Sequence, residues 1–314
     1  MAHQKFQDLG FGTKAAEAQA RLLNRDGSFN IRRKGQPFFE AFSGYHYLIS
    51  IPWWQFSLWL FGAYVLINAG FGAVYYAVGL SGLSGIDGRT AMSQYFESVF
   101  FSAQTFTTVG FGRIAPVSAL ASTVAALESM AGLLSFALAT GLLYGRFSRP
   151  VARIIYSGAA VVAPYRAPES KATSGLMFRV ANQRSNQLIE VEAIVTLGWV
   201  EVTEKGERVR RFHQLELERN KVNFFHLSWT VVHPIEPESP LYGITQEQLD
   251  AADAEFLIIL KAFDDTFSQT VYSRTSYKAH EVLFGHKFGP IIRTAPDGVT
   301  EIQLDKIHNH ERVS

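Results

Sequence analysis

Two long segments without charge, separated by a shorter apolar one, constrain this chain more than any other feature. Residues 52–78 contain no Asp, Glu, Lys, Arg or His, and residues 117–145 contain a single charged side chain, Glu128. A helix needs about 20 apolar residues to cross the hydrocarbon core of a bilayer, so each segment is long enough to span one. Their length and lack of charge disfavour a buried helix of a soluble protein. Aromatic residues mark both ends of the first segment, as in interfacial belts: Trp53, Trp54, Trp59, Tyr75 and Tyr76.

The segment between the two predicted spans, residues 93–116, is too short to cross a membrane. Its first part, residues 93–107, has the pattern of a short apolar helix, and it leads into a loop that contains Gly110 and Gly112. Irregular backbone at membrane depth is tolerated only where protein buries it or where it lines a water-filled cavity. We therefore predict a re-entrant pore helix followed by a loop that lines a pore.

The loop Thr108-Val109-Gly110-Phe111-Gly112 resembles the selectivity-filter signature of potassium channels, which commonly has Tyr where Phe111 stands. In such a filter, backbone carbonyl oxygens replace the water around K+, and glycines supply dihedral angles that other residues disfavour. We expect K+ to bind at Thr108, Val109, Gly110 and Phe111. One chain supplies one wall of the pore, which implies a homotetramer. The hydroxyl lost at Phe111 predicts a slightly softer filter that remains selective for potassium.

Lysine and arginine indicate the orientation. The connection over residues 79–113 contains only Arg89 and Arg113, whereas basic residues gather before the first span and after the second. By the positive-inside rule, both termini are cytoplasmic and the pore loop enters from outside. The flanking basic residues are Lys5, Lys14, Arg21, Arg25, Arg32, Arg33, Lys34, Arg146, Arg149 and Arg153.

Five residues of the second span recur at intervals of four and are expected to share one helical stripe: Glu128, Gly132, Phe136, Thr140 and Tyr144. The stripe either lines the pore or packs against the first span. In the first case, Phe136 and Tyr144 form hydrophobic rings that close the pore by dewetting. An intramembrane carboxylate faces protein or water rather than lipid, so Glu128 is either structural or an attractor of cations.

The cytoplasmic border of the spans combines aromatic and basic residues. Residues 37–50 mix aromatic side chains with Glu40 and His46, which is typical of an interfacial helix that lies along the membrane. Three arginines follow the second span, and they either simply obey the positive-inside rule or bind lipid phosphates. These candidate lipid-binding residues are Arg146, Arg149 and Arg153.

The rest of the chain, residues 150–314, has the pattern of a β-sandwich. Apolar and polar residues alternate over 189–197, as in a half-buried strand. One short helix is expected at 245–253, and further strands are expected at 175–181, 208–218, 224–232, 255–263 and 267–276. Five histidines of this region lack the spacing of metal ligands and are interpreted as structural: His213, His226, His233, His280 and His286. The chain has no cysteine, which suits a reducing cytoplasm.

From about residue 37 to about residue 310 the chain resembles the inward-rectifier potassium channel family, in particular its prokaryotic branch. The strings that carry the resemblance are TTVGFG, RFSRP, LMFRVANQR, TVVHPIEPESPLYG, AEFLIIL and SRTSYKAHEVLFGHKF. The resemblance implies a two-span α-helical pore domain and an immunoglobulin-like, all-β cytoplasmic domain that forms a tetrameric vestibule. It also implies a slide helix at 37–50, control by phosphoinositides or other anionic lipids, and a location in the bacterial inner membrane.

The chain departs from the family pattern at several positions. Strong rectifiers carry an acid where this chain has Phe136, and many members carry a vestibule acid where it has Lys261. A vestibule glutamate is kept at Glu190, whereas Gln104 replaces the glutamate often found behind the filter. The resemblance therefore implies weak block by Mg2+ or polyamines.

The sequence as a whole predicts a passive potassium channel of the inward-rectifier type. We expect no enzymatic activity and no cofactor besides K+ in the filter, and the net charge of +1 gives no sign of nucleic-acid binding. The alternatives are a weakly selective cation channel of the same build and a membrane-anchored ligand-binding module with a vestigial pore. The expected parts are an N-terminal segment at 1–36, the slide helix at 37–50, the pore domain at 51–149 (outer helix 52–78, pore helix 93–107, filter 108–112, inner helix 117–145) and the cytoplasmic domain at 150–314.

Overall fold

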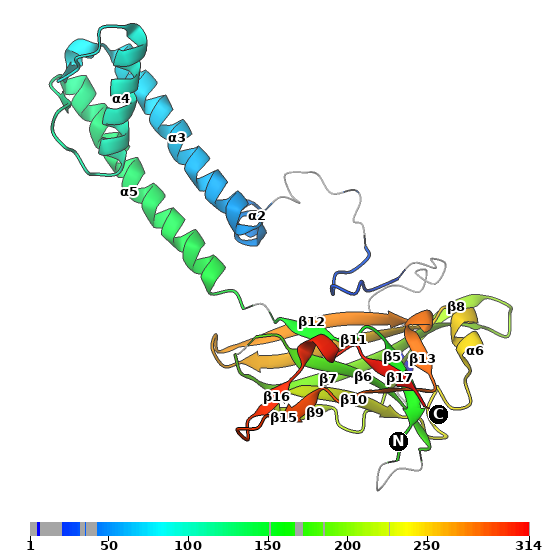
Figure 1. Cartoon of the computed structure of the whole chain (residues 1–314). Coiled ribbons are helices and arrows are strands. Elements are labelled where there is room, and N and C mark those ends of the chain that lie inside the picture. The colour runs from blue at the N-terminus through cyan, green and yellow to red at the C-terminus, as the bar shows by residue number, and fades with distance from the viewer. Residues whose placement is uncertain are drawn as a thin grey trace. The chain divides into compact units, whose positions relative to one another are not determined.

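A computed structural model describes residues 5–6, 21–31, 35, 43–150, 152–166, 172–184, 186–225 and 227–313 (Figure 1). The chain divides into two compact units. One is helical and comprises Gly35–Arg149, and the other combines Met1–Lys34 with Pro150–Ser314. Residues 37–42 of the expected slide helix, most of the N-terminal segment and His226 lie outside the described residues.

The described residues of the helical unit, 35 and 43–149, include four α-helices. These are α2 (Gly44–Ser50), α3 (Trp53–Val78), α4 (Ala91–Phe106) and α5 (Ala119–Phe147). The described part of the expected slide helix is thus the seven-residue α2, which begins after the N-cap Ser43. A short pairing of β2 (Leu83–Ser84) with β3 (Ala115–Pro116) closes the connection around α4.

Helices α3 and α5 are the predicted spans. Each is long and apolar enough to cross a membrane, with mean hydropathies of 1.5 and 1.6 and 11% of each apolar window buried within the chain. Apolar side chains exposed over such a length are unfavourable in water, so we expect lipid or other protein to cover them. The two-span helical unit confirms this part of the predicted fold class.

Helix α4 packs against both spans through close contacts. Tyr75 of α3 meets Phe101 of α4 with ring centroids 4.9 Å apart. A Cβ on Gly72 would lie 2.5 Å from Val99 of α4, so α3 and α4 approach closely only because this residue is glycine. Together with Leu83, Ile114 and Ala121, the aromatic pair forms the apolar core of this unit.

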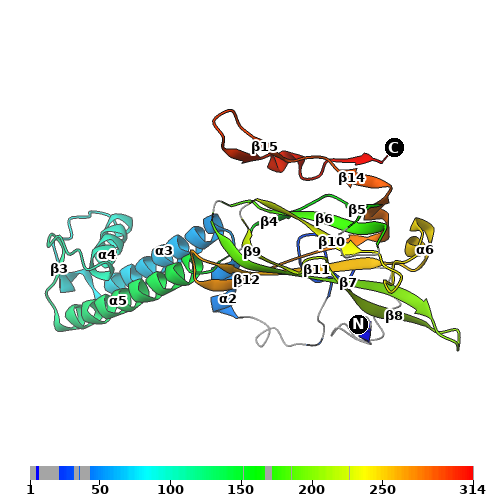
Figure 2. The ribbon, with the colours of Figure 1, turned by 90° about the horizontal axis from the view of Figure 1, so that it is seen from below.

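The second unit is a β-sandwich of two sheets (Figure 2). The larger sheet has the order β1-β8-β7-β11-β12, with β9 also paired to β7, and the smaller has the order β10-β6-β5-β13, with β4 paired to β6. The larger sheet comprises β1 (Lys5–Phe6), β7 (Leu188–Val202), β8 (Arg208–Leu215), β9 (Lys221–Phe225), β11 (Glu255–Asp264) and β12 (Gln269–Lys278). The smaller comprises β4 (Ile154–Tyr156), β5 (Ala160–Pro164), β6 (Ser174–Asn182), β10 (Ser228–Pro234) and β13 (Val282–Phe284).

Residues from both sheets form one buried core, which confirms the sandwich. Val195 of β7 and Ile258 of β11 belong to the same cluster as Phe178 of β6 and Val231 of β10. Helix α6 (Gln246–Ala251), capped by Thr245, adds Leu249 to this core. The stretch expected as one strand at 224–232 is divided between β9 and β10, and the remaining expected strands and the short helix are present with ends shifted by a few residues.

Two antiparallel strand pairs near the C-terminal end, one enclosing the other in sequence, were not predicted. They are β14 (His286–Phe288) with β17 (His310–Arg312), and β15 (Ile292–Thr294) with β16 (Thr300–Ile302). Ile291 and Ile307 of this region are buried against Ala181 of β6. The strands are too short for their alternation to be recognised in the sequence.

Residues 21–30 pack against the sandwich, although they are distant in sequence from most of its strands. The carboxylate of Glu255 accepts hydrogen bonds from the backbone N–H groups of Leu22 and Leu23 at 2.9 and 3.1 Å. Arg21 and Arg25 form ion pairs with Glu281. This part of the N-terminal segment is therefore a component of the second unit.

Candidate functional site

The pore helix α4 positions the loop with the filter sequence. Its N-terminus has a capping box, in which Thr90 N donates to Ser93 Oγ at 3.1 Å and Ser93 N donates to Thr90 Oγ1 at 3.2 Å. The helix ends at Phe106, and Thr107 N donates to the carbonyl of Ala103 at 3.2 Å. The loop of residues 108–112 therefore leaves directly from a fixed helix end.

The loop backbone alternates in the sign of φ. Thr108, Gly110 and Gly112 have φ of 58°, 50° and 81°. Glycine adopts this left-handed region without steric cost, whereas Thr108 needs the surrounding structure to hold it there. The carbonyl oxygen of Gln104 accepts hydrogen bonds from Val109 N at 2.9 Å and Gly110 N at 3.3 Å. These bonds tie the loop to the last turn of α4.

Side chains of the loop have little cover within the chain. Val109 is 55% exposed and Phe111 is 79% exposed. Among the residues that the structure describes, a Cβ placed on Gly110 or Gly112 would meet nothing within 4 Å. The side of the loop that a single chain leaves open is thus available to further copies of the protein.

A buried polar network behind the loop joins three helices. Glu128 of α5 is fully buried, and its Oε2 accepts a hydrogen bond from the Tyr75 hydroxyl at 2.6 Å while Ser102 of α4 contacts its Oε1. Ser102 Oγ also donates to Asn68 Oδ1 at 3.0 Å, and Asn68 Nδ2 donates to the carbonyl of Tyr64 at 2.7 Å. Of the two interpretations left open for Glu128, this geometry supports the structural one.

The five residues that were expected to share one stripe on the second span differ in their burial within the chain. Glu128 and Gly132 are buried against α4, whereas Phe136 and Tyr144 are 73% and 74% exposed and Thr140 is exposed as well. The reason is geometric. Residues four apart on an α-helix drift by about 40° per step, so the stripe turns through roughly 160° between its first and last members.

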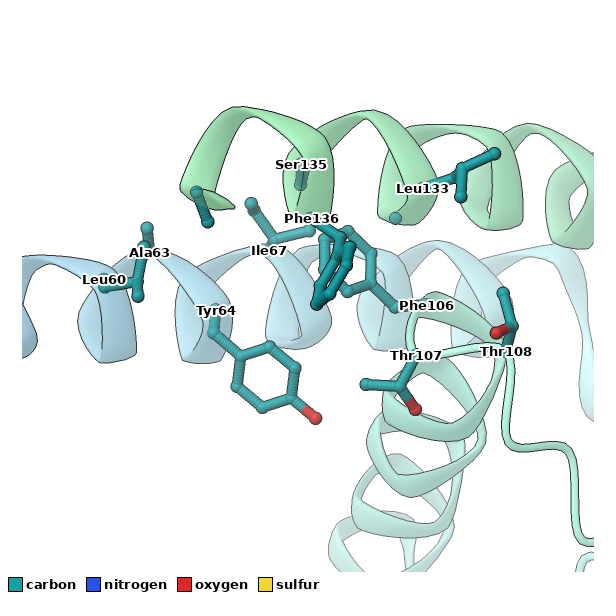
Figure 3. A pocket seen from close by; sticks show the side chains of 12 residues that line it. Leu60, Ala63, Tyr64, Ile67, Phe106, Thr107, Thr108, Leu133, Ser135 and Phe136 are labelled. Carbon is teal, nitrogen blue, oxygen red and sulfur yellow. The ribbon is translucent and has the colours of Figure 1, made fainter. Parts of the chain in front are cut away.

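Phe136 lies beside the inner end of the filter loop. A pocket of about 570 Å³ is lined by α3, α5 and the end of α4. Figure 3 shows Phe136 in this pocket together with Phe106, Thr107 and Thr108. Of the five stripe residues, Phe136 is therefore the exposed one placed nearest to the loop. Sequence spacing alone did not distinguish it from Glu128 and Gly132.

The guanidinium of Arg146, one of the candidate lipid-binding residues, is engaged within the helical unit. Its Nη1 and Nη2 donate to the carbonyls of Leu48 at 2.5 Å and Ile51 at 2.7 Å. The same group lies 4.5 Å from the ring centroid of Trp53 and 4.7 Å from that of Phe56. Arg146 thus caps the end of α2 and fixes it to the base of both long helices.

The other two candidate lipid-binding arginines are more available. Arg149 is exposed and donates to Ser50 Oγ at 3.0 Å. Arg153 is exposed and follows four residues later in the other unit. Both side chains can therefore take up a phosphate without breaking a buried contact.

The two candidate vestibule residues lie on neighbouring strands. Lys261 of β11 is directly opposite Glu192 of β7, and a β-bulge follows in this pairing. Glu190 stands at the bulge with φ of 52°, and its carboxylate is 3.4 Å from Lys221 Nζ. Because the side chains of both partners are largely exposed, at 65% and 46%, the ion pair offsets the charge of Glu190 only in part.

Sequence reasoning missed the partners of Glu128 and an ion pair at the outer end of the loop. A lone carboxylate in an apolar span requires hydrogen-bond donors, and Asn68, Tyr75 and Ser102 were available signals in the neighbouring segments. At the outer end, Arg113 Nη2 donates to Glu97 Oε1 at 2.7 Å. The available signal for this pair was that two residues of opposite charge lie within the short connection between the spans.

Two spans, a pore helix that ends in a glycine-spaced loop, and an appended β-sandwich define the class of pore-forming ion-channel subunits. Residues 62–149 match the family described as "Ion channel", and residues 154–314 match the family described as "Inward rectifier potassium channel C-terminal domain".

Individual relatives agree with these family matches. The chain is 36% identical to the inward rectifier potassium channel Kirbac3.1 of Paramagnetospirillum magnetotacticum, over 95% of this chain and 98% of that protein. It is 26% identical to the ATP-sensitive inward rectifier potassium channel 12 of Bos taurus, over 96% of this chain and 74% of that one. A structural comparison matches the sporulation control protein Spo0M of Bacillus subtilis, covering 47% of this chain and 62% of that chain at 7% identity. Its TM-score of 0.23 is too low for the match to bear on fold or function.

The chain belongs to the inward rectifier potassium channel family. This is a family of membrane ion channels and not of enzymes.

Proposed function

We propose that this protein is a potassium-selective, inward-rectifier-type channel that conducts K+ passively across a membrane. The observation that carries the proposal is the loop of residues 108–112, with positive φ at every second residue, at the end of a pore helix between two spans. Alternation of φ lets successive carbonyl oxygens lie on one side of the chain. A row of such oxygens is what replaces the water shell of K+.

The proposed assembly is a homotetramer. One loop provides one wall, and Val109 and Phe111, exposed in the single chain, would be covered by neighbouring copies. K+ is the transported ion, bound by Thr108, Val109, Gly110 and Phe111, and no other cofactor is proposed. Gly112 provides the turn at the outer end of the filter.

The proposed location is the bacterial inner membrane, with both termini in the cytoplasm. Support comes from the basic residues that flank the two spans, compared with only Arg89 and Arg113 between them. Phe136, Thr140 and Tyr144 are proposed to line the pore, and Glu190 and Lys261 to line the vestibule, where Mg2+ or polyamines block weakly.

Potassium flux into liposomes that contain the purified protein tests the proposal, with barium as blocker. Reversal potentials in mixed K+ and Na+ separate a selective filter from the weakly selective alternative that Phe111 raises. Selective, barium-sensitive flux supports the proposal. Flux that does not distinguish the two ions favours the weakly selective channel, and the absence of flux under all conditions favours a ligand-binding module with a vestigial pore.

Tyr144 is proposed as a gate because its ring is exposed in the last turns of α5. We expect Tyr144→Ala to raise basal flux several-fold, since it removes a bulky apolar ring from the cytoplasmic mouth. Tyr144→Phe keeps the ring and is the matched control, with flux close to that of the parent. The measurement is rubidium uptake at equal protein content. Unchanged or lower uptake in Tyr144→Ala would make Tyr144 a packing residue.

Arg149 of the helical unit and Arg153 of the second unit are each proposed to bind phosphoinositides or other anionic lipids, and Arg146 to hold α2 in place. Each basic residue near an anionic surface contributes about 1 kcal/mol. We therefore expect the double variant Arg149→Gln, Arg153→Gln to shift the lipid dose response by about tenfold or more. Vesicles with graded phosphoinositide content give the measurement. The control neutralises the exposed Arg184 and Arg312 instead, and equal shifts in both double variants would argue against a specific site.

A further inference from the structure

An arginine stands at the outer end of the filter loop, where a cation channel gains nothing from positive charge. Arg113 immediately follows Gly112, and its side chain is 60% exposed. Adjacent Cα atoms are about 3.8 Å apart, so the Cα of Arg113 lies next to the end of the loop and its guanidinium lies within one side-chain length of it. In a tetramer the position repeats in every copy and forms a ring of positive charge around the path of the entering ion.

Glu97 of the pore helix forms an ion pair with this arginine. Its Oε1 accepts a hydrogen bond from Arg113 Nη2 at 2.7 Å, and its Oε2 accepts bonds from the backbone N–H groups of Asp87 at 2.9 Å and Gly88 at 3.0 Å. The Glu97 side chain is only 18% exposed, less than a third of the exposure of its partner. Oε1 of Glu97 thus binds Arg113, and Oε2 binds the backbone of the outer loop.

The outer loop also holds the backbone of Arg113. Gly85 has φ of 79°, and a Cβ on it would lie 1.9 Å from the carbonyl oxygen of Arg113. Backbone and side chain of Arg113 are therefore both fixed, which keeps its charge at one place. Gln104, nearer to the filter in the same pore helix, is neutral and offers no opposite charge.

We propose that Glu97 is the counter-charge that cancels the Arg113 ring, and that this pair sets the rate of K+ entry from outside and the affinity for external divalent blockers. The inference rests on the proposed function. Within residues 79–118 the charged side chains are Asp87 and Glu97 against Arg89 and Arg113, so the outer mouth is neutral as long as Glu97 is ionised. Charges of one sign at a narrow mouth change the local concentration of permeant ions and hence their entry rate.

Two substitutions and their combination vary the ring charge while keeping a polar side chain at each position. Glu97→Gln keeps a side-chain oxygen for the two backbone N–H groups and places a neutral amide against Arg113. Arg113→Gln leaves Glu97 as a negative ring, and the double variant removes both charges. Arg89→Gln, at an exposed position of the same loop, is the control for a general change of surface charge.

Inward single-channel conductance is measured at about 20 mM and about 1 M K+, because the Debye length falls from roughly 20–30 Å to about 3 Å over this range. At low salt we expect Glu97→Gln to conduct at least about threefold less than the parent, Arg113→Gln to conduct more, and the double variant to recover. External Ba2+ affinity is expected to be lower than the parental value in Glu97→Gln, higher in Arg113→Gln and close to the parental value in the double variant. At about 1 M K+ the conductances of the parent, the two single variants and the double variant are expected to become equal.

Two results would overturn the inference while leaving the proposed function intact. One is a loss of conductance in Glu97→Gln that persists at about 1 M salt and is not recovered by the second substitution, because the pair would then act only by holding the loop in shape. Another is an effect of Arg89→Gln as large as that of Arg113→Gln. Potassium selectivity of the parent, measured in the same recordings, reports separately on the proposed function.

Discussion

Gly110→Ala is expected to abolish potassium flux while the protein still folds and assembles. In the single chain a methyl group at this position meets no atom within 4 Å, so the effect does not come from a clash. It comes from the backbone, because Gly110 has φ of 50°, a conformation that costs a residue with a Cβ roughly 1–2 kcal/mol. In a tetramer this cost is repeated in each chain at one ring of carbonyl oxygens, and the oxygens turn away from the ion.

Gly206→Ala is the matched control for this substitution. Gly206 has φ of 78° and likewise no atom within 4 Å of an added Cβ, but it lies in the turn between β7 and β8. It carries the same backbone cost away from the filter, so its flux and selectivity are expected to stay at the parental level. The measurement combines size-exclusion chromatography with barium-sensitive flux. Normal, selective flux through Gly110→Ala would show that the filter has been assigned to the wrong residues.

Phe136→Asp is expected to convert weak rectification into steep, voltage-dependent block by spermine. The side chain of Phe136 is 73% exposed and shares a pocket with Thr107 and Thr108, so an acid there would face a blocker directly below the filter. Two unit charges about 4 Å apart attract by about 4 kcal/mol at an effective dielectric constant of about 20. Since about 1.4 kcal/mol is a tenfold change, we expect spermine affinity to rise by at least about 100-fold.

Phe136→Asn separates charge from size and polarity, since Asn has nearly the shape of Asp. It is expected to leave spermine block weak. Outward current through reconstituted channels is recorded with and without cytoplasmic spermine. Steep block of the unmodified channel at micromolar spermine would contradict weak rectification. Because the structure buries Glu128, that outcome would assign the block to Glu190, whose charge Lys221 offsets only in part.

The sequence was sufficient for features that depend on length and on local backbone chemistry. Spans of 26 and 29 residues were recognisable because a bilayer demands an unbroken apolar run. The loop at 108–112 was recognisable because the glycines occupy positions where the backbone needs positive φ. The same reasoning explains why the alternating strand β7 was predicted within a few residues of its ends.

Features that depend on contacts between distant residues were not accessible in the same way. The burial of Glu128 follows from where α3 and α4 place Tyr75 and Ser102, and a spacing of four residues contains no information on that. Similarly, the basic character of Arg146 made it a candidate lipid contact, but nothing in the sequence indicated that its guanidinium donates to the carbonyls of Leu48 and Ile51. A charged residue near a membrane surface can serve either role, and only its neighbours decide.

The close contact at Gly132 fixes α5 at this residue, so the part of α5 that follows can tilt about it. A Cβ at Gly132 would lie 2.0 Å from the carbonyl oxygen of Phe106, so the helix cannot rotate there without driving a neighbouring side chain into the pore helix. Gly141, by contrast, has no atom within 4 Å of an added Cβ. Tyr144 lies about 18 Å along the helix from Gly132, so a tilt of about 10° about that point carries its ring through about 3 Å. In the proposed channel, such a tilt would move the Tyr144 ring and widen the proposed gate while the loop of residues 108–112 stays in place.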